Sequence, residues 1–291
     1  MKNLGPIFKE IRQARHFSLE EATGGEFSRS MLSRFENGQN DLSTQRFFTA
    51  LNHIHLSLKE FEEIAGLKEE HFIAKTLNNI HQQTTPEHLQ ELYDKQIELY
   101  QQTKIKEEYL AAIIIKAYLV TFQPFDGTEG PIGSEEELTF LHDYLFSIDV
   151  WYGNEIGLFS ITSPLFPSQI YKNYTEEMVD RPDFPNMMKF NRETMLTLLL
   201  NGFLLCIAYQ DHENTAYFDH LIQEYFFEEN EVYQRIIYFY GKGEWQYHLG
   251  NREKGIQEMK KYVDILRILG CDQSADYYQL GIENLLSYKS S

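Results

Sequence analysis

A short polar stretch, residues 28–38, carries the side chains whose types and spacing are best suited to contact another molecule. It reads Ser-Arg-Ser-Met-Leu-Ser-Arg-Phe-Glu-Asn-Gly, and Leu32 and Phe35 are spaced so that both can face inward on a helix. The hydroxyl and guanidinium groups are then left for the outward face, and Asn37-Gly38 ends the helix because glycine accepts the left-handed conformation. The DNA major groove accepts a short helix with such groups on one face.

The hydrogen-bonding side chains on and near this helix are candidate DNA contacts. Arginine suits a guanine edge and a hydroxyl suits either a base or a phosphate, so we expect Arg29 and Ser30 to reach bases and Ser33 to assist. The nearby arginines could neutralise phosphates. The full candidate set is Arg12, Arg15, Ser28, Arg29, Ser30, Ser33, Arg34, Gln39 and Asn40. The alternative interpretation is a solvated helix face, or a plain polar loop for Gln39 and Asn40.

Helix signals in residues 1–66 predict the small domain that positions this stretch. Ser18 and Ser57 are each followed three residues later by glutamate, which is the capping box that begins a helix. Apolar residues recur at helical spacing from Leu4 onward, and Gly66 ends the last of five short helices. We therefore expect a five-helix DNA-binding domain over residues 1–66.

Residues 67–291 are also predicted to be helical. The expected spans are 68–82, 86–103, 105–122, 134–148, 164–180, 187–209, 213–228, 231–249, 252–269 and 274–287. Within residues 236–269, small residues at Gly243, Gly250 and Gly255 would let two antiparallel helices touch, and the period is that of a tetratricopeptide repeat. The chain is therefore predicted to be all-α, with a right-handed solenoid of tetratricopeptide-like helix pairs after the first domain.

Charge and composition limit the remaining function classes. The net charge is −18, but residues 1–50 hold seven basic and six acidic residues, whereas residues 67–291 hold 18 basic and 35 acidic ones, so DNA contacts are expected only in the first domain. Cys206 and Cys271 provide no disulfide framework, and neither a membrane span nor a signal segment is evident, so we expect a cytoplasmic protein. The histidines lack metal-ligand spacing, and no residue pattern supports catalysis, a metal or a cofactor.

Residues 28–38 are close to the recognition-helix pattern of Xre-type helix-turn-helix proteins. The segment from the cap at Ser18 to Phe27 is ten residues long instead of the usual eleven, and Glu26 replaces a usual glycine. This shortened turn resembles the Rgg/GadR/MutR branch of Gram-positive regulators. Trp151, residues 176–179 and the glycine spacing of residues 241–270 fall in that family's order. The resemblance implies a transcription regulator whose tetratricopeptide-like domain, residues 67–291, dimerises and binds a short signalling peptide, as in quorum sensing.

The same resemblance implies three partners: double-stranded DNA with an inverted-repeat operator, a short peptide and a second copy of the chain. In that family an arginine at about the position of Arg12 pairs with a glutamate at about the position of Glu36. The resemblance therefore implies that this pair joins the first and third helices. An alternative is a helical-repeat scaffold that binds a protein partner and is only weakly specific for DNA. A protected inverted repeat in the chain's own upstream DNA would favour the regulator.

Asn201 is the most informative polar residue of the second part, because it lies in the apolar run of residues 198–205. An unpaired amide there would cost roughly 1–3 kcal/mol. It either bonds the backbone of a bound peptide or forms a hydrogen bond between helices. Arg192 would pair either a peptide carboxylate or an internal acid. Aromatic residues complete the candidate peptide-binding set or belong to the core: Tyr174, Tyr209 and Phe239.

Overall fold

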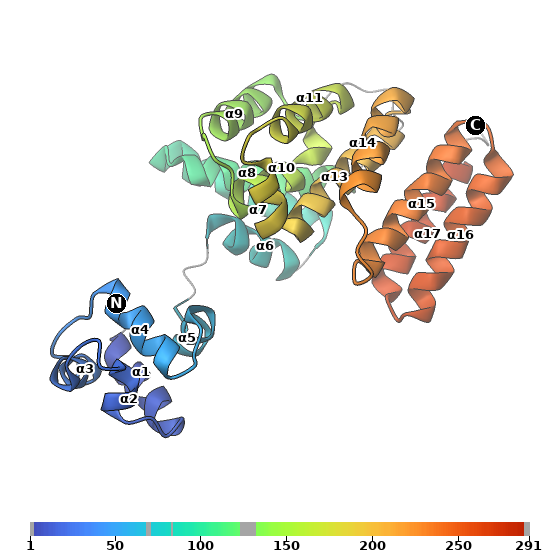
Figure 1. Cartoon of the computed structure of the whole chain (residues 1–291). Helices are drawn as coiled ribbons and strands as arrows, with labels where there is room; N and C mark the ends of the chain where they lie inside the picture. Colours follow the sequence, from blue (N-terminus) through green and yellow to red (C-terminus); the bar gives the residue numbers. More distant parts are fainter. Residues whose placement is uncertain (1–2, 68–70, 83, 123–131, 288–291) are drawn as a thin grey trace. The chain divides into compact units, whose positions relative to one another are not determined.

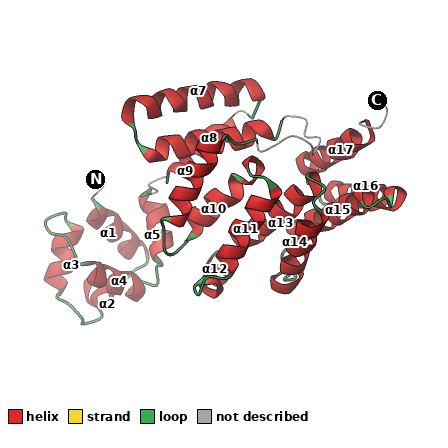
Figure 2. Ribbon diagram, turned by 90° about the horizontal axis from the view of Figure 1, so that it is seen from above, coloured by secondary structure: helices red, strands yellow, loops and turns green. Residues whose placement is uncertain are grey.

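The computed structural model describes residues 3–67, 71–82, 84–122 and 132–287. Within these residues every regular element is a helix, and no β-strand occurs in them (Figure 2). The all-α prediction is confirmed. The chain divides into two compact units, Met1–His71 and Phe72–Ser291. The predicted domain boundary after Gly66 falls next to residues 68–70, which lie outside the described residues.

The N-terminal unit contains five short helices (Figure 1). They are α1 (Leu4–Ala14), α2 (Leu19–Thr23), α3 (Arg29–Glu36), α4 (Thr44–His53) and α5 (Leu58–Ala65). Each begins at a polar residue whose side chain accepts a backbone N–H: Asn3, Ser18, Ser28, Ser43 and Ser57. The two predicted capping boxes form at Ser18 and Ser57. Local hydrogen bonds therefore determine where these helices begin.

Aromatic side chains from different helices form the core of this unit. The ring of Phe35 lies 6.2 Å from that of Phe8 and 5.9 Å from that of Phe47, and Phe47 lies 5.0 Å from Phe61. Leu32 is fully buried on the same face of α3 as Phe35. Because that face points into the core, the first turn of α3 is left on the surface.

The C-terminal unit is a series of packed helices (Figure 1). Its elements are α6 (Phe72–Gln82), α7 (Pro86–Thr103), α8 (Lys106–Val120), α9 (Glu135–Phe146), α10 (Gly153–Ile161), the 3-10 turn η1 (Ser163–Leu165), α11 (Ser168–Val179), α12 (Phe184–Phe190), α13 (Arg192–Ala208), α14 (His212–Tyr225), α15 (Val232–His248), α16 (Arg252–Ile268) and α17 (Asp272–Ser287). Helix α7 packs on α8, α13 on α14, α15 on α16, and α16 on α17. In these four cases, helices that are consecutive in the chain pack as pairs.

Glycine contacts confirm the helix pair predicted in residues 236–269. A Cβ atom on Gly255 would lie 2.6 Å from the carbonyl oxygen of Gly243, and one on Gly243 would lie 3.1 Å from that of Gly255. Gly250 has a positive φ of 94° in the turn between α15 and α16. Small residues at these spacings let the two helices come into backbone contact.

Two predicted spans differ from the observed helices, and one observed helix has no predicted span. Helix α10 is absent from the predicted spans, because Gly153 and Gly157 weaken its helix signal. The expected span 187–209 is interrupted at Asn191, whose φ and ψ of −128° and 31° are not helical, and the residues before it form α12. The expected span 164–180 begins as η1, and α11 starts only at Ser168. Of the expected span 68–82, residues 68–70 lie outside the described residues.

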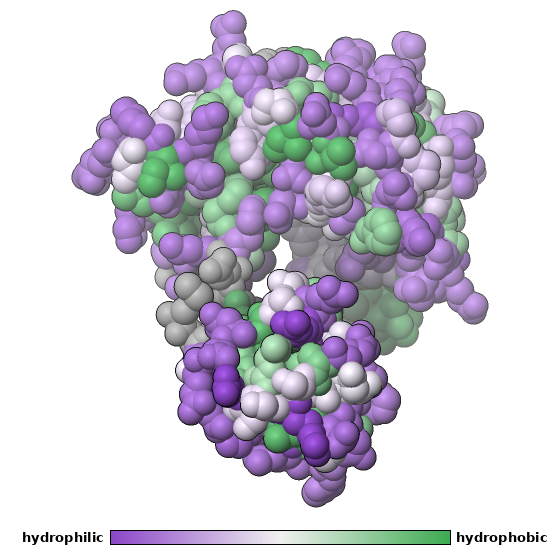
Figure 3. Space-filling view, turned by 60° about the vertical axis from the view of Figure 1, so that its left-hand side comes forward, coloured by the Kyte–Doolittle hydropathy of each residue, from purple (hydrophilic) through white to green (hydrophobic). Residues whose placement is uncertain are grey.

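Helix α13 lies at the centre of the C-terminal unit. It packs against α10, α11, α12, α14 and α15. Its buried residues include Leu196, Leu199 and Phe203, so apolar side chains surround most of its circumference. Hydrophilic side chains cover most of the molecular face seen in Figure 3. In the part of the chain that the structure describes, none of the helices is both long and apolar enough to cross a membrane.

Candidate nucleic-acid interface and ligand pocket

The first turn of α3 presents polar side chains to solvent. The hydroxyl of Ser28 accepts a hydrogen bond from the backbone N–H of Met31 at 3.3 Å, so this serine acts as the helix N-cap. Arg29 and Ser30 are exposed, and Ser33 is half-buried. The predicted DNA-contacting face is therefore accessible within the N-terminal unit.

Arg29 forms an ion pair on this surface. Its Nη1 atom lies 2.8 Å from Oε2 of Glu20 on α2, and the two side chains are 65% and 70% exposed. Ion pairs at such exposure contribute roughly 0–1 kcal/mol. The guanidinium therefore remains available to a competing partner at little cost.

Arg12 is buried, which corrects the prediction of a phosphate contact. Its Nε and Nη2 atoms donate to the carboxylate of Glu36 at 2.6 and 2.7 Å, and its Nη1 donates to the carbonyl oxygen of Phe17 at 2.6 Å. The Arg12 and Glu36 side chains are 8% and 2% exposed. The pair joins α1 to α3, as the family resemblance implies, and leaves Arg12 no access to DNA.

The remaining candidate DNA contacts lie on the surface. Arg15 is exposed, and its Nη1 donates to the carbonyl oxygens of Ile54 and His55 at 3.0 and 2.6 Å. These acceptors carry no formal charge, so the Arg15 cation is not neutralised by them. The other members are exposed at the end of α3 and after it: Arg34, Gln39 and Asn40.

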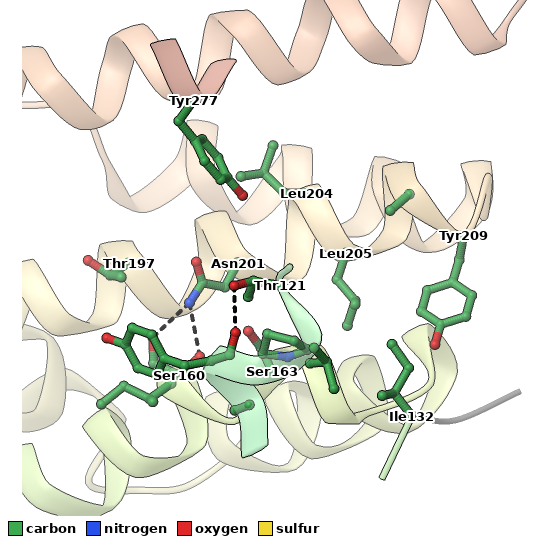
Figure 4. Close-up of a pocket in the computed structure, with 16 residues that line it drawn as sticks. Thr121, Ile132, Ser160, Ser163, Thr197, Asn201, Leu204, Leu205, Tyr209 and Tyr277 are labelled. Atoms are coloured by element: carbon green, nitrogen blue, oxygen red, sulfur yellow. Dashed lines mark hydrogen bonds between the residues drawn. The ribbon is translucent and has the colours of Figure 1, made fainter. Parts of the chain in front are cut away.

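A pocket of about 500 Å³ lies in the C-terminal unit between α8, α10, η1 and α13 (Figure 4). Tyr277 of α17 also lines it. The wall combines apolar side chains with hydroxyl groups, including those of Thr121, Ser160 and Ser163. None of its sixteen described lining residues carries a formal charge, although 24% of the chain is charged. Such a wall suits an uncharged, largely apolar ligand.

Asn201 lies on this wall. Its side-chain nitrogen donates to the backbone oxygen of Ser160 at 2.9 Å and is 3.2 Å from the Ser160 hydroxyl oxygen (Figure 4). The hydrogen bond between helices, one of the two interpretations from the sequence, is therefore present and joins α13 to α10. The amide oxygen of Asn201 points away from Ser160 (Figure 4).

Tyr209 is the other predicted peptide-binding residue that lines the pocket. The other three lie elsewhere. Arg192 pairs with Glu231 at 2.6 Å and with Glu228 at 3.3 Å, and its guanidinium lies 4.8 Å from the ring centre of Phe226. Of the two interpretations from the sequence, the structure contains the pair with an internal acid, and the peptide role of Arg192 stays a prediction.

Tyr174 and Phe239 also pack against other side chains. The ring of Tyr174 lies 4.8 Å from that of Phe146 and 5.7 Å from that of Phe166. Phe239 stacks on Tyr262 at 5.5 Å. Neither residue lines the pocket. Tyr174 packs against the core of the C-terminal unit, whereas Phe239 is 38% exposed, so their assignment to a peptide groove stays a prediction.

Several pocket residues are missed by sequence reasoning. Ser160 and Ile161 lie on α10, which is not among the predicted spans, and Ser163 and Pro164 lie on the 3-10 turn η1. The only feature of the sequence that could have indicated these residues is the pair Ser160 and Ser163 within an apolar segment. No group of histidine, cysteine and acidic side chains within the described ranges has the geometry to hold a metal ion.

The N-terminal unit is therefore a five-helix domain that exposes the start of α3, and the C-terminal unit is a series of packed helices. The family model described as "HTH-type transcriptional regulator Rgg, C-terminal domain" matches residues 90–280. The chain therefore belongs to the Rgg family of transcriptional regulators, a family of regulators and not of enzymes.

Solved structures share the fold over nearly the full length. The SHP pheromone receptor Rgg2 of Streptococcus dysgalactiae has a TM-score of 0.71 and 24% identity, and the match covers 96% of this chain and 98% of that one. A protein of Listeria monocytogenes EGD-e has a TM-score of 0.76 and 21% identity, with 99% and 98% covered. PrgX in its iCF10 complex has a TM-score of 0.71 and 13% identity, with 100% and 98% covered.

Proposed function

We propose that this Rgg-family regulator acts in the cytoplasm as a dimer that binds an inverted-repeat operator through α3, under the control of a short apolar peptide. The observation that carries the DNA-binding part is the capped α3, which buries Leu32 and leaves Arg29 and Ser30 exposed. Guanidinium and hydroxyl groups at the start of such a helix are suited to base edges.

Dimerisation follows from the size of this surface. One recognition helix covers only a few base pairs, so two half-sites are needed for useful specificity. The N-terminal part is nearly neutral, whereas residues 67–291 carry 18 basic and 35 acidic residues and would repel the duplex. DNA contact is therefore assigned to the N-terminal unit.

The peptide-binding part is supported by the uncharged wall of the pocket. A ligand that enters it must bury neutral groups, because an unpaired charge there would be strongly disfavoured. The Asn201 amide oxygen suits a backbone N–H of an extended peptide. The similar structures include an SHP pheromone receptor and PrgX in complexes with iCF10 and cCF10. Such a ligand would control DNA binding by favouring one conformation of the regulator.

Footprinting on the chain's own upstream DNA tests the DNA-binding part. We expect protection of an inverted repeat, and loss of that protection in Arg29→Ala. Lys59→Ala is a matched control, because it removes one exposed cation from α5 and leaves α3 unchanged. Uniform protection without a repeat, equal for all three proteins, would instead favour the weakly specific scaffold.

Isothermal titration with short apolar peptides tests the pocket. Asn201→Ala should weaken binding by roughly tenfold, the value of one hydrogen bond with a buried partner. Ala208→Leu should also weaken it, because the larger side chain narrows the pocket without removing the Asn201 bonds. Asn186→Ala, an exposed position on α12, is the matched control. Full affinity in both pocket variants would contradict this assignment.

A further inference from the structure

The ion pair between Arg29 and Glu20 is a feature that neither stability nor the family assignment explains. Arg29 is the first residue of α3, where the positive end of the helix dipole disfavours a cation. Glu20 reaches it from α2 and places a carboxylate oxygen 2.8 Å from Nη1. The cation at this unfavourable position is therefore accompanied by an anion from the neighbouring helix.

The pair contributes little to folding. Both side chains are about two-thirds exposed, and such pairs are weak and screened by salt. Glu20 is also not needed for the start of α2, because the capping box is formed by Ser18 and Glu21. Neither helix capping nor stability therefore requires the Glu20 carboxylate, so it can act in DNA recognition.

Geometry places Glu20 next to whatever Arg29 contacts. A group that accepts a hydrogen bond from Arg29 Nη1 lies about 3 Å from that atom, so it lies within roughly 6 Å of the Glu20 carboxylate oxygen. At that separation two anions repel each other even at 0.1 M salt, where the screening length is about 10 Å. A phosphate near Arg29 would therefore meet an opposing charge.

We propose that Glu20 is a specificity-determining residue, which orients Arg29 in the free protein and penalises DNA on which Arg29 finds no guanine edge. This inference rests on the proposed DNA-binding role of α3. At a matching base pair, two hydrogen bonds from Arg29 to guanine compensate for the lost ion pair and the exposed carboxylate. At other sequences the repulsion is not compensated. Glu20 thus lowers affinity for arbitrary DNA more than for the operator.

Fluorescence anisotropy with the full chain tests this role. Two duplexes are used, the footprinted operator and a scrambled duplex of equal composition, with Glu20→Gln, Arg29→Ala and the double variant. Glu20→Gln should bind the scrambled duplex roughly three- to tenfold more tightly, and it should lower the ratio of specific to non-specific affinity by up to about the same factor. In the Arg29→Ala background the same change should leave that ratio unaltered.

Glu63→Gln is the matched control, because it removes one exposed negative charge from α5. It should leave the ratio unchanged. An equal gain of Glu20→Gln on both duplexes, the same with or without Arg29, would show that Glu20 contributes only charge and would overturn this inference alone. If the unaltered chain does not distinguish the two duplexes, the proposed function fails and the inference fails with it.

Discussion

The buried ion pair between Arg12 and Glu36 allows a structural role to be separated from a DNA contact. Three guanidinium nitrogens of Arg12 donate to two acceptors, the Glu36 carboxylate and the Phe17 carbonyl oxygen. Arg12→Met removes the cation and keeps an unbranched apolar side chain in place of the arginine stem. It leaves the Glu36 carboxylate buried at 2% exposure without its counter-ion.

The expected loss is large for a unit of this size. Breaking a buried ion pair by removing one partner costs about 3–5 kcal/mol. At about 0.05–0.15 kcal/mol per residue, a unit that extends from Met1 to His71 has a total stability of roughly 4–11 kcal/mol. Arg12→Met should therefore remove at least about a quarter of the stability of the N-terminal unit. Arg12→Met combined with Glu36→Leu should recover most of the loss, because an apolar pair of similar volume often replaces a buried ion pair at no cost.

Hydrogen exchange followed by mass spectrometry measures this effect in the full chain. Peptides from α1, α3 and α4 should lose protection in Arg12→Met and regain it in the double variant, whereas peptides from α13 should be unchanged in both. The double variant, which is expected to be folded, also tests whether Arg12 contacts DNA. Its DNA affinity should depend on salt concentration as that of the unaltered protein does. Loss of a phosphate contact would instead reduce the slope of log affinity against log salt concentration by about 0.9.

Two results would refute the reasoning. In the first, Arg12→Met lowers the free energy of opening, measured by hydrogen exchange, by less than about 1 kcal/mol. The ion pair would then not behave as a buried one. A folded double variant with a lower salt slope would return Arg12 to the DNA-binding surface.

Further predictions concern both units. Gly255→Ala should destabilise the C-terminal unit by about 1–3 kcal/mol because its Cβ would meet Gly243, whereas Gly157→Ala, whose Cβ meets no atom within 4 Å, should stabilise it by up to about 1 kcal/mol. Calorimetry checks both, and equal effects would contradict the packing. Burial raises the pKa of Glu244 from 4.5 to about 7, so the folded state binds more protons than the unfolded state between these values and stability falls as pH rises through this window. Glu244→Gln should therefore raise the unfolding temperature more at pH 8 than at pH 5, and equal shifts would disprove this. Arg15→Ala should weaken binding to operator and scrambled DNA alike and lower the salt slope by about 0.9, and an unchanged slope would exclude its phosphate contact.

Features encoded by neighbouring residues are predictable. The capping boxes at Ser18 and Ser57 join residues three apart, and the inward spacing of Leu32 and Phe35 determines which face of α3 is exposed. The contact between α15 and α16 is also recognisable, because glycine is required where two backbones touch. These signals need no knowledge of distant partners.

The pocket is not predictable in the same way. Helix α10 contains Gly153 and Gly157, and its stability comes from burial against α13 and α8, which no local pattern reports. Asn201 is recognisable as a polar residue in an apolar helix, but its partner Ser160 lies on that unpredicted helix. The residues around Asn201 therefore do not reveal the nature of its contact.

Residue type and spacing along single helices are enough to establish an all-helical chain, the start and exposed face of α3, and the division of charge between the two parts. Which charged groups are already paired depends instead on how distant helices pack. Glu36 lies 24 positions after Arg12, and Glu231 lies 39 after Arg192. Such pairs form only when folding brings those helices together. The residues that neighbour an arginine in the sequence therefore do not identify its ion-pair partner.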